Sequence, residues 1–196
     1  FHCLSWITGG YGKQQNEAKL WDHYWPSADS PMPDPQWPKA TQAKRGTNGY
    51  LYSKPIAIGK SPEGRPPHFF DWAPDDQPEN QTADCKVVDW AAGELARKHS
   101  KPFFHAVGIF RPHIPWYAPE KYFDLYPKDK VFLPKILKDD LQDVPPHGHY
   151  GIRKQWHKWL VENNQWREAV RGYLASISFA DAQVGRLIDA LDKSPH

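Results

Sequence analysis

Hydrophobic residues recur at helical spacing in the middle of the chain. Five of them predict a helix over residues 83–99: Val87, Val88, Trp90, Ala91 and Leu95. Thr82 suits the N-cap of this helix, because a threonine hydroxyl can accept a backbone N–H of the first turn. The basic residues 97–99 suit its end, where the helix dipole is negative.

A second and longer helical pattern covers residues 164–193. Its large apolar residues form one stripe of the kind that faces a protein core: Trp166, Val170, Tyr173, Leu174, Ile177, Val184, Leu187, Ile188 and Leu191. The spacing predicts an amphipathic helix that covers most of this stretch.

Between the two helices lies a short, nearly continuous apolar run, Phe103–Phe110. Such a run is typical of a strand in a parallel sheet. Residues 111–115 are expected to be extended, because a residue before proline avoids the α region. Pro119 predicts a short helix up to Tyr126, and residues 127–150 are expected to be loops. Helix, strand and helix in succession predict an α/β layer architecture.

Composition separates residues 1–81 from the rest. The chain has 20 Pro among 196 residues, and 14% of its residues are aromatic. The aromatic content argues against disorder. The frequent prolines predict long loops over residues 1–81, held to a body by aromatic anchors, with short strands at residues 50–52 and 56–58. The carboxylates of Asp75 and Asp76 are expected to be exposed.

Charge and cysteine content exclude few functions. A net charge of +2 gives no sign of a nucleic-acid partner, and no apolar run is long enough to span a membrane. Cys3 and Cys85 are compatible with one disulfide or with two free thiols.

His113 is the strongest candidate for chemistry, because it follows the predicted strand. In open α/β sheets, ligands bind beyond the carboxyl ends of the strands. An imidazole there can bind an anion or protonate a leaving group. The alternative is a loop histidine that is only hydrogen-bonded. His147 and His149 are better explained as a solvated loop than as a metal pair.

Two long segments of the chain carry a family resemblance. Residues 101–119 read KPFFHAVGIFRPHIPWYAP, and residues 173–191 read YLASISFADAQVGRLIDAL. Both resemble type I sulfatases, which depend on a formylglycine nucleophile. They are most similar to the iduronate-2-sulfatase-like branch of bacteria.

The resemblance implies an alkaline-phosphatase/sulfatase-type α/β sandwich with a mostly parallel central sheet, only part of which is present here. It implies hydrolysis of sulfate esters on sugars or polysaccharides, with Ca²⁺ as cofactor. His113 matches the family's P-H-x-P histidine, which contacts the sulfate and assists the leaving group. His2 matches a second catalytic histidine, and Arg111 is expected to bind the substrate.

The sequence also departs from the family. Neither Cys3 nor Cys85 lies in the C-x-[PA]-x-R motif that yields formylglycine, and no residue matches a metal ligand. Residues 1–196 are therefore expected to be an internal part of a catalytic domain, with loops over 1–81 and a helix-strand-helix core portion over 82–196. The nucleophile and the Ca²⁺ ligands are expected outside this stretch, which alone should be inactive.

Two alternatives remain. One is a phosphodiesterase or phosphonate hydrolase of the same fold, and the other is an aromatic-rich glycan-binding module without catalysis. The family resemblance implies a periplasmic or secreted protein.

Overall fold

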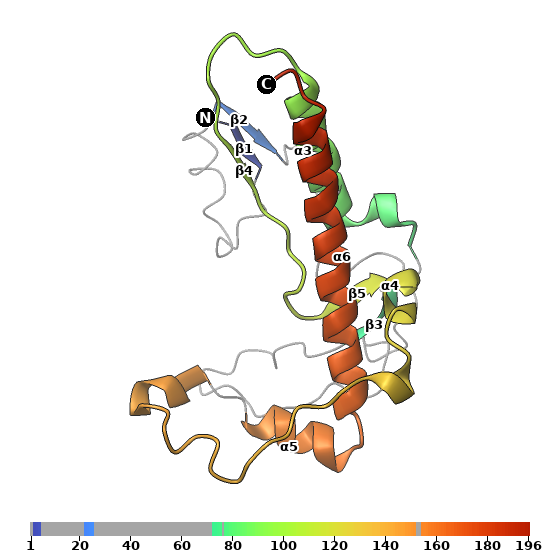
Figure 1. The fold of residues 1–196 in the computed structure, drawn as a ribbon, viewed down its shortest axis with the longest axis vertical. Helices are drawn as coiled ribbons and strands as arrows, with labels where there is room; N and C mark the ends of the chain where they lie inside the picture. Colours follow the sequence, from blue (N-terminus) through green and yellow to red (C-terminus); the bar gives the residue numbers. More distant parts are fainter. Residues whose placement is uncertain (1, 5–21, 26–71, 76, 152–153) are drawn as a thin grey trace, which may run out of the picture.

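Helix α6, Trp166–Asp192, is the longest element of the fold and runs along most of the molecule (Figure 1). The fold is taken from a computed structural model, which describes residues 2–4, 22–25, 72–75, 77–151 and 154–196. Three more α-helices are described: α3, Ala83–Ala96; α4, Glu120–Asp124; and α5, Lys154–Glu162. Short 3₁₀ turns are η2, Glu79–Gln81; η3, Lys128–Lys130; and η4, Pro146–Gly151.

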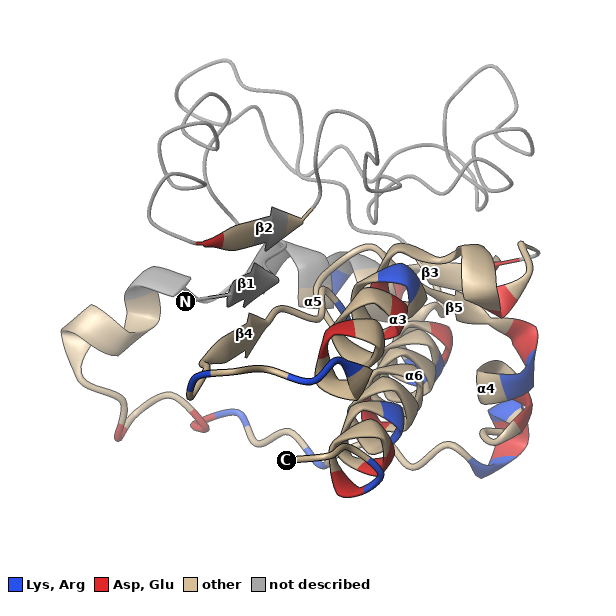
Figure 2. Ribbon diagram, turned by 90° about the horizontal axis from the view of Figure 1, so that it is seen from above, with Lys and Arg blue, Asp and Glu red and all other residues tan. Residues whose placement is uncertain are grey.

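The described strands form two small parallel sheets. The first has the order β2-β1-β4, made of β1, His2–Leu4; β2, His23–Trp25; and β4, His105–Val107. The second pairs β3, Trp72–Asp75, with β5, Trp116–Pro119. Helices α3 and α6 lie next to each other beside the first sheet (Figure 2). Parallel strands with helices packed beside them confirm the predicted α/β class.

Among the described residues, the core forms three clusters along α6. Near its end, Leu187 packs against Trp25, Val87 and Ala91. In its middle, Ala175 and Phe179 pack against residues of α3, β5 and α4. At its start, Ala169 packs against Trp72 and Leu160. One helix thus connects both sheets to the other helices.

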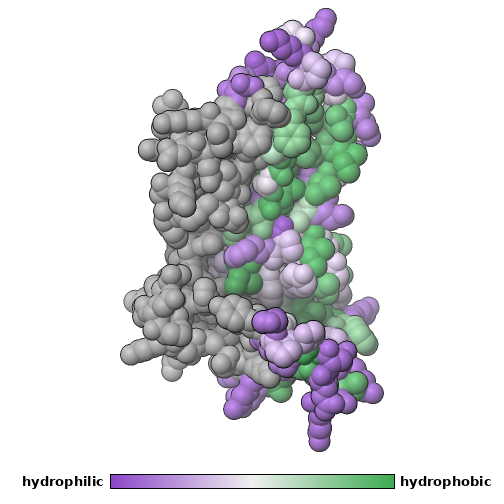
Figure 3. All heavy atoms as spheres, turned by 90° about the vertical axis from the view of Figure 1, so that its left-hand side faces the viewer, coloured by the Kyte–Doolittle hydropathy of each residue, from purple (hydrophilic) through white to green (hydrophobic). Residues whose placement is uncertain are grey.

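The face of α6 that packs is not the one that the large apolar residues predict. Its buried residues are Ala169, Gly172, Ala175, Ser176, Phe179 and Gln183. Five members of the predicted stripe are exposed: Tyr173, Ile177, Val184, Ile188 and Leu191. Figure 3 shows hydrophobic residues gathered in a band on the described part of the molecular surface. Two members of the stripe, Trp166 and Leu187, do pack against core clusters, but the fully buried positions of α6 are mostly small residues, which let the helix approach its neighbours closely.

Helix α3 begins as predicted. The Thr82 hydroxyl accepts the N–H of Cys85 at 3.3 Å and donates to the carbonyl oxygen of Glu79 at 2.7 Å. The helix ends at Ala96, three residues before the predicted end. Beyond that end, His99 Nε2 lies 2.8 Å from the Glu94 carbonyl oxygen, and this contact caps the last turn.

Substituting Thr82 with alanine should lower the free energy of unfolding by about 1 kcal/mol, because one N–H of the first turn loses its acceptor. Thr82→Ser keeps the hydroxyl and should retain most of the stability. Urea denaturation of both variants measures the difference. Equal losses in the two variants would contradict a capping role for the hydroxyl.

Other local predictions differ from the structure. The predicted strand 103–110 shortens to the three half-buried residues of β4, which lies at the edge of the described part of its sheet. Residues 154–162, for which no element was predicted, form α5, and Leu160 of this helix is buried. Asp75 is buried in β3, where it accepts hydrogen bonds from Gln77. The strands predicted at 50–52 and 56–58 lie outside the described residues.

Within the described ranges, no helix is both long enough and apolar enough to pass through a lipid bilayer.

Candidate functional site

A tight turn follows β4 and carries His113. The N–H of His113 donates to the carbonyl oxygen of Phe110 at 3.0 Å, which closes the turn over Arg111 and Pro112. The Arg111–Pro112 and Ile114–Pro115 peptide bonds are both cis. Residues 111–115 therefore turn, where an extended segment was predicted, and the chain then enters β5.

The imidazole of His113 is exposed and lies against the Phe110 ring, with 4.8 Å between the ring centroids. Its Nδ1 lies 2.6 Å from the carbonyl oxygen of Ile114. A carbonyl oxygen only accepts, so Nδ1 carries the proton of this hydrogen bond. The second nitrogen, Nε2, is then the one through which His113 can act on a substrate. His113 is thus a hydrogen-bonded loop histidine, as the alternative interpretation expected. This hydrogen bond uses Nδ1 and is compatible with chemistry at Nε2.

Asp84 holds the start of the turn from the first turn of α3. One carboxylate oxygen accepts the N–H of Phe110 at 2.7 Å, and the other accepts the N–H of Arg111 at 3.1 Å. The Asp84 side chain is buried. This burial raises the pKa of Asp84, while the Arg111 charge and the two backbone donors act in the opposite direction.

Arg111 points into the protein rather than out of the turn. It is buried, its Nε donates to the carbonyl oxygen of Tyr117 at 2.6 Å, and its guanidinium lies 5.1 Å from the centroid of the Phe110 ring. These contacts connect the turn to β5. The role of Arg111 in substrate binding stays a prediction.

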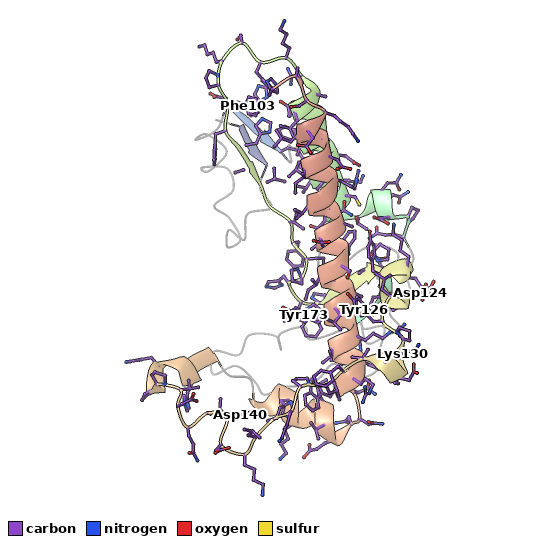
Figure 4. The ribbon with its side chains drawn as sticks, in the orientation of Figure 1. Phe103, Asp124, Tyr126, Lys130, Asp140 and Tyr173 are labelled. Carbon is purple, nitrogen blue, oxygen red and sulfur yellow. The ribbon has the colours of Figure 1, made fainter. Side chains whose placement is uncertain are left out.

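An aromatic pair lies next to the turn. The indole N–H of Trp116 donates to the carbonyl oxygen of Pro112 at 2.9 Å, and the Trp116 and Tyr173 ring centroids are 5.2 Å apart. Tyr173 extends from α6 on the side of this turn (Figure 4). With 42% of its surface exposed, Tyr173 presents an aromatic ring beside the segment that carries His113.

The turn lies within a part of the chain that matches a known protein family. Residues 29–196 match the family model described as "Sulfatase", and this range includes α3, β4, the His113 turn and α6. The chain belongs to the sulfatase family.

Several curated relatives are similar to this sulfatase chain. A sulfatase of Formosa agariphila is 35% identical over 129 residues, which cover 64% of this chain and 25% of the relative. Human iduronate 2-sulfatase is 29% identical over 167 residues, which cover 78% of this chain and 28% of the relative. An arylsulfatase of Clostridium perfringens is 33% identical over 108 residues, or 55% of this chain and 22% of the relative. The chain thus spans about a quarter of the length of these relatives.

The sheet register relates His2 of this sulfatase chain to the segment that precedes His113. His2 is paired with His105, the first residue of β4, and His113 comes after Val107, the last residue of β4. The side chain of His2 lies outside the described residues. Its catalytic role stays a prediction.

A metal site needs several ligand side chains, such as His, Cys, Asp and Glu, close together. Among the side chains that the structure describes, no three or more His, Cys, Asp or Glu gather to hold a metal ion. His149 instead places Nε2 3.0 Å from the carbonyl oxygen of Val144. The described residues therefore do not form a calcium site.

Cys85, which the sequence left open as a disulfide partner or a free thiol, is a buried free thiol. Its Sγ lies 3.2 Å from Oε1 of Gln183.

The sequence singled out His113 as a candidate but gave no sign of the residues that surround it. Asp84 was assigned no role, although its place in the first turn after an N-cap was evident. Its partner amides lie 26 and 27 residues further along the chain, and no local pattern indicates such a contact. Trp116 and Tyr173 lie within the two family-like segments, but only the fold shows that their rings meet.

Proposed function

We propose that the sulfatase containing this chain hydrolyses sulfate esters of sugars or polysaccharides, and that His113 protonates the oxygen of the departing alcohol. The match of residues 29–196 to the sulfatase family carries the proposal, because this range includes the turn with the exposed imidazole. Relatives named as sulfatases are similar to 64% and 78% of this chain.

The proposed step is a proton transfer. The S–O bond to the alcohol breaks, and its electron pair goes to the alcohol oxygen. The protonated imidazole of His113 donates its Nε2 proton to that oxygen, and Nδ1 keeps its hydrogen bond to Ile114. The neutral imidazole then takes a proton from water. Attack on sulfur requires a nucleophile, which the family resemblance assigns to a formylglycine outside these residues.

Sugar substrates are supported by two observations. Human iduronate 2-sulfatase, whose name specifies a sulfate on a sugar acid, is similar to 78% of this chain. The exposed ring of Tyr173, which contacts Trp116 beside the turn, provides an apolar surface against which a sugar ring can pack.

The test is the substrate range of the full-length protein. We expect turnover of a sulfated uronate oligosaccharide and of 4-nitrophenyl sulfate, and no turnover of bis(4-nitrophenyl) phosphate. Turnover of the phosphate diester alone would identify a phosphodiesterase and overturn the proposal. Turnover of simple aryl sulfates without any sulfated sugar would overturn the substrate class and keep the reaction. Binding of the oligosaccharide without turnover would identify a glycan-binding module.

A further inference from the structure

The carboxylate of Asp84 makes its hydrogen bonds to residues outside its own helix. In the first turn of α3, Thr82 caps the helix by accepting the N–H of Cys85, so Asp84 is not needed as the cap. Its two oxygens instead accept two consecutive N–H groups, those of Phe110 and Arg111, at 2.7 and 3.1 Å. One side chain thus holds the backbone at the start of the His113 turn.

Phe110 connects this hold to His113. Its N–H donates to Asp84, its carbonyl oxygen accepts the N–H of His113 at 3.0 Å, and its ring lies 4.8 Å from the imidazole. A shift of Phe110 would therefore move both the backbone and the ring of His113. Proton transfer depends steeply on such placement, because a misplacement of about 1 Å can cost about 100-fold in rate.

Burying a carboxylate costs free energy, because its charge is removed from water. Burial raises the pKa of Asp84 even though the charge of Arg111 favours the ionised form. A buried ion pair often contributes little net stability, although removing one of its members leaves the other charge buried and unpaired. The arrangement is better explained by the geometry that it imposes on residues 110–113 than by the stability that it adds.

We propose that Asp84 is a positioning residue, which fixes the imidazole of His113 through the backbone of Phe110 and Arg111. This inference rests on the proposed role of His113 in sulfate ester hydrolysis. Asp84 does not touch the substrate in this account; it acts only through the turn.

The first test needs no activity. In the full-length protein, Asp84→Asn removes one of the two acceptors, so hydrogen exchange in peptides covering residues 108–114 should become about tenfold faster. Glu94→Gln is the matched control, because Glu94 is also buried in α3 but pairs with Arg97. The control should leave exchange at 108–114 unchanged. Unchanged exchange in Asp84→Asn would overturn the proposal.

The second test is a double-mutant cycle on sulfate ester turnover. Asp84→Asn should lower kcat by about 10- to 100-fold in the unsubstituted enzyme, but by less than about threefold in a His113→Ala background. Equal losses in both backgrounds would show that Asp84 acts only on the fold, and would overturn the proposal. If the unsubstituted enzyme hydrolyses no sulfate ester, the proposed function fails, and the exchange experiment alone decides whether Asp84 holds the turn.

Discussion

Replacing His113 with alanine should lower kcat of the full-length enzyme on a sulfated sugar by about 10²- to 10⁴-fold, the usual contribution of a positioned general acid. The melting temperature should change little. The imidazole is exposed, and it contacts only neighbouring residues, through the Phe110 ring and the carbonyl oxygen of Ile114. Steady-state kinetics and thermal unfolding of the same preparation measure the two effects.

His149→Ala provides the matched control for this variant. His149 is also an exposed loop histidine, and one of its ring nitrogens also contacts a backbone carbonyl oxygen, that of Val144 at 3.0 Å. It lies in η4, away from the turn between β4 and β5. Its substitution should leave kcat unchanged. If His113→Ala lost folding and activity together, or if both variants lost equal activity, His113 would be a structural loop histidine.

The leaving group distinguishes a proton donor from a residue that only binds sulfate. A sugar alkoxide is a poor leaving group and needs the proton, whereas 4-nitrophenolate is a stable anion that departs without one. The loss caused by His113→Ala should therefore be much smaller on 4-nitrophenyl sulfate than on a sulfated sugar. Equal losses on both substrates would assign His113 to sulfate binding and exclude the proposed proton transfer.

Local patterns predicted α3 and α6 well, although they gave no sign of α5. The periodic residues of α3 and α6, together with the cap at Thr82, placed three of the four helix ends within two residues of the observed ones. The position of His113 followed from a general rule about where ligands bind in α/β sheets, and it needed no long-range contact. A segment whose structure depends mainly on neighbouring residues is accessible to such reasoning.

Contacts between distant segments were not predictable in this way. The hydrogen bonds of Asp84 to the His113 turn join residues from α3 and from the segment after β4. The packing face of α6 depends on where a neighbour comes close, and small residues mark that place more than large ones do. Periodicity identifies apolar residues, but it gives no information about which neighbour approaches.

At Gly172, α6 comes very close to β3. A Cβ added there would lie 2.5 Å from Cβ of Trp72 and 3.1 Å from its Cγ. Trp72 is a buried residue of β3, and its Cβ is fixed by the backbone, so a change of side-chain rotamer gives no relief. An alanine at position 172 therefore requires α6 and β3 to move apart.

Gly172→Ala should lower the free energy of unfolding by about 1–3 kcal/mol, the usual cost of overpacking a core. Gly185→Ala is the matched control in the same helix, because no atom lies within 4 Å of its added Cβ. It should raise stability by roughly 0.5–1 kcal/mol, since alanine favours a helix interior more than glycine does. Urea denaturation of the full-length protein measures both, and a stabilising Gly172→Ala would contradict the close packing of α6 on β3.

The effect of Gly172→Ala should also reach the His113 turn. Trp72 is paired with Trp116 in the β3–β5 sheet, and the indole of Trp116 donates to the carbonyl oxygen of Pro112 at 2.9 Å. A displaced β3 would therefore move the residue next to His113, so kcat should fall together with stability, whereas Gly185→Ala should keep full activity. A destabilised Gly172→Ala enzyme with unchanged kcat would show that the turn is held from the α3 side alone, through Asp84.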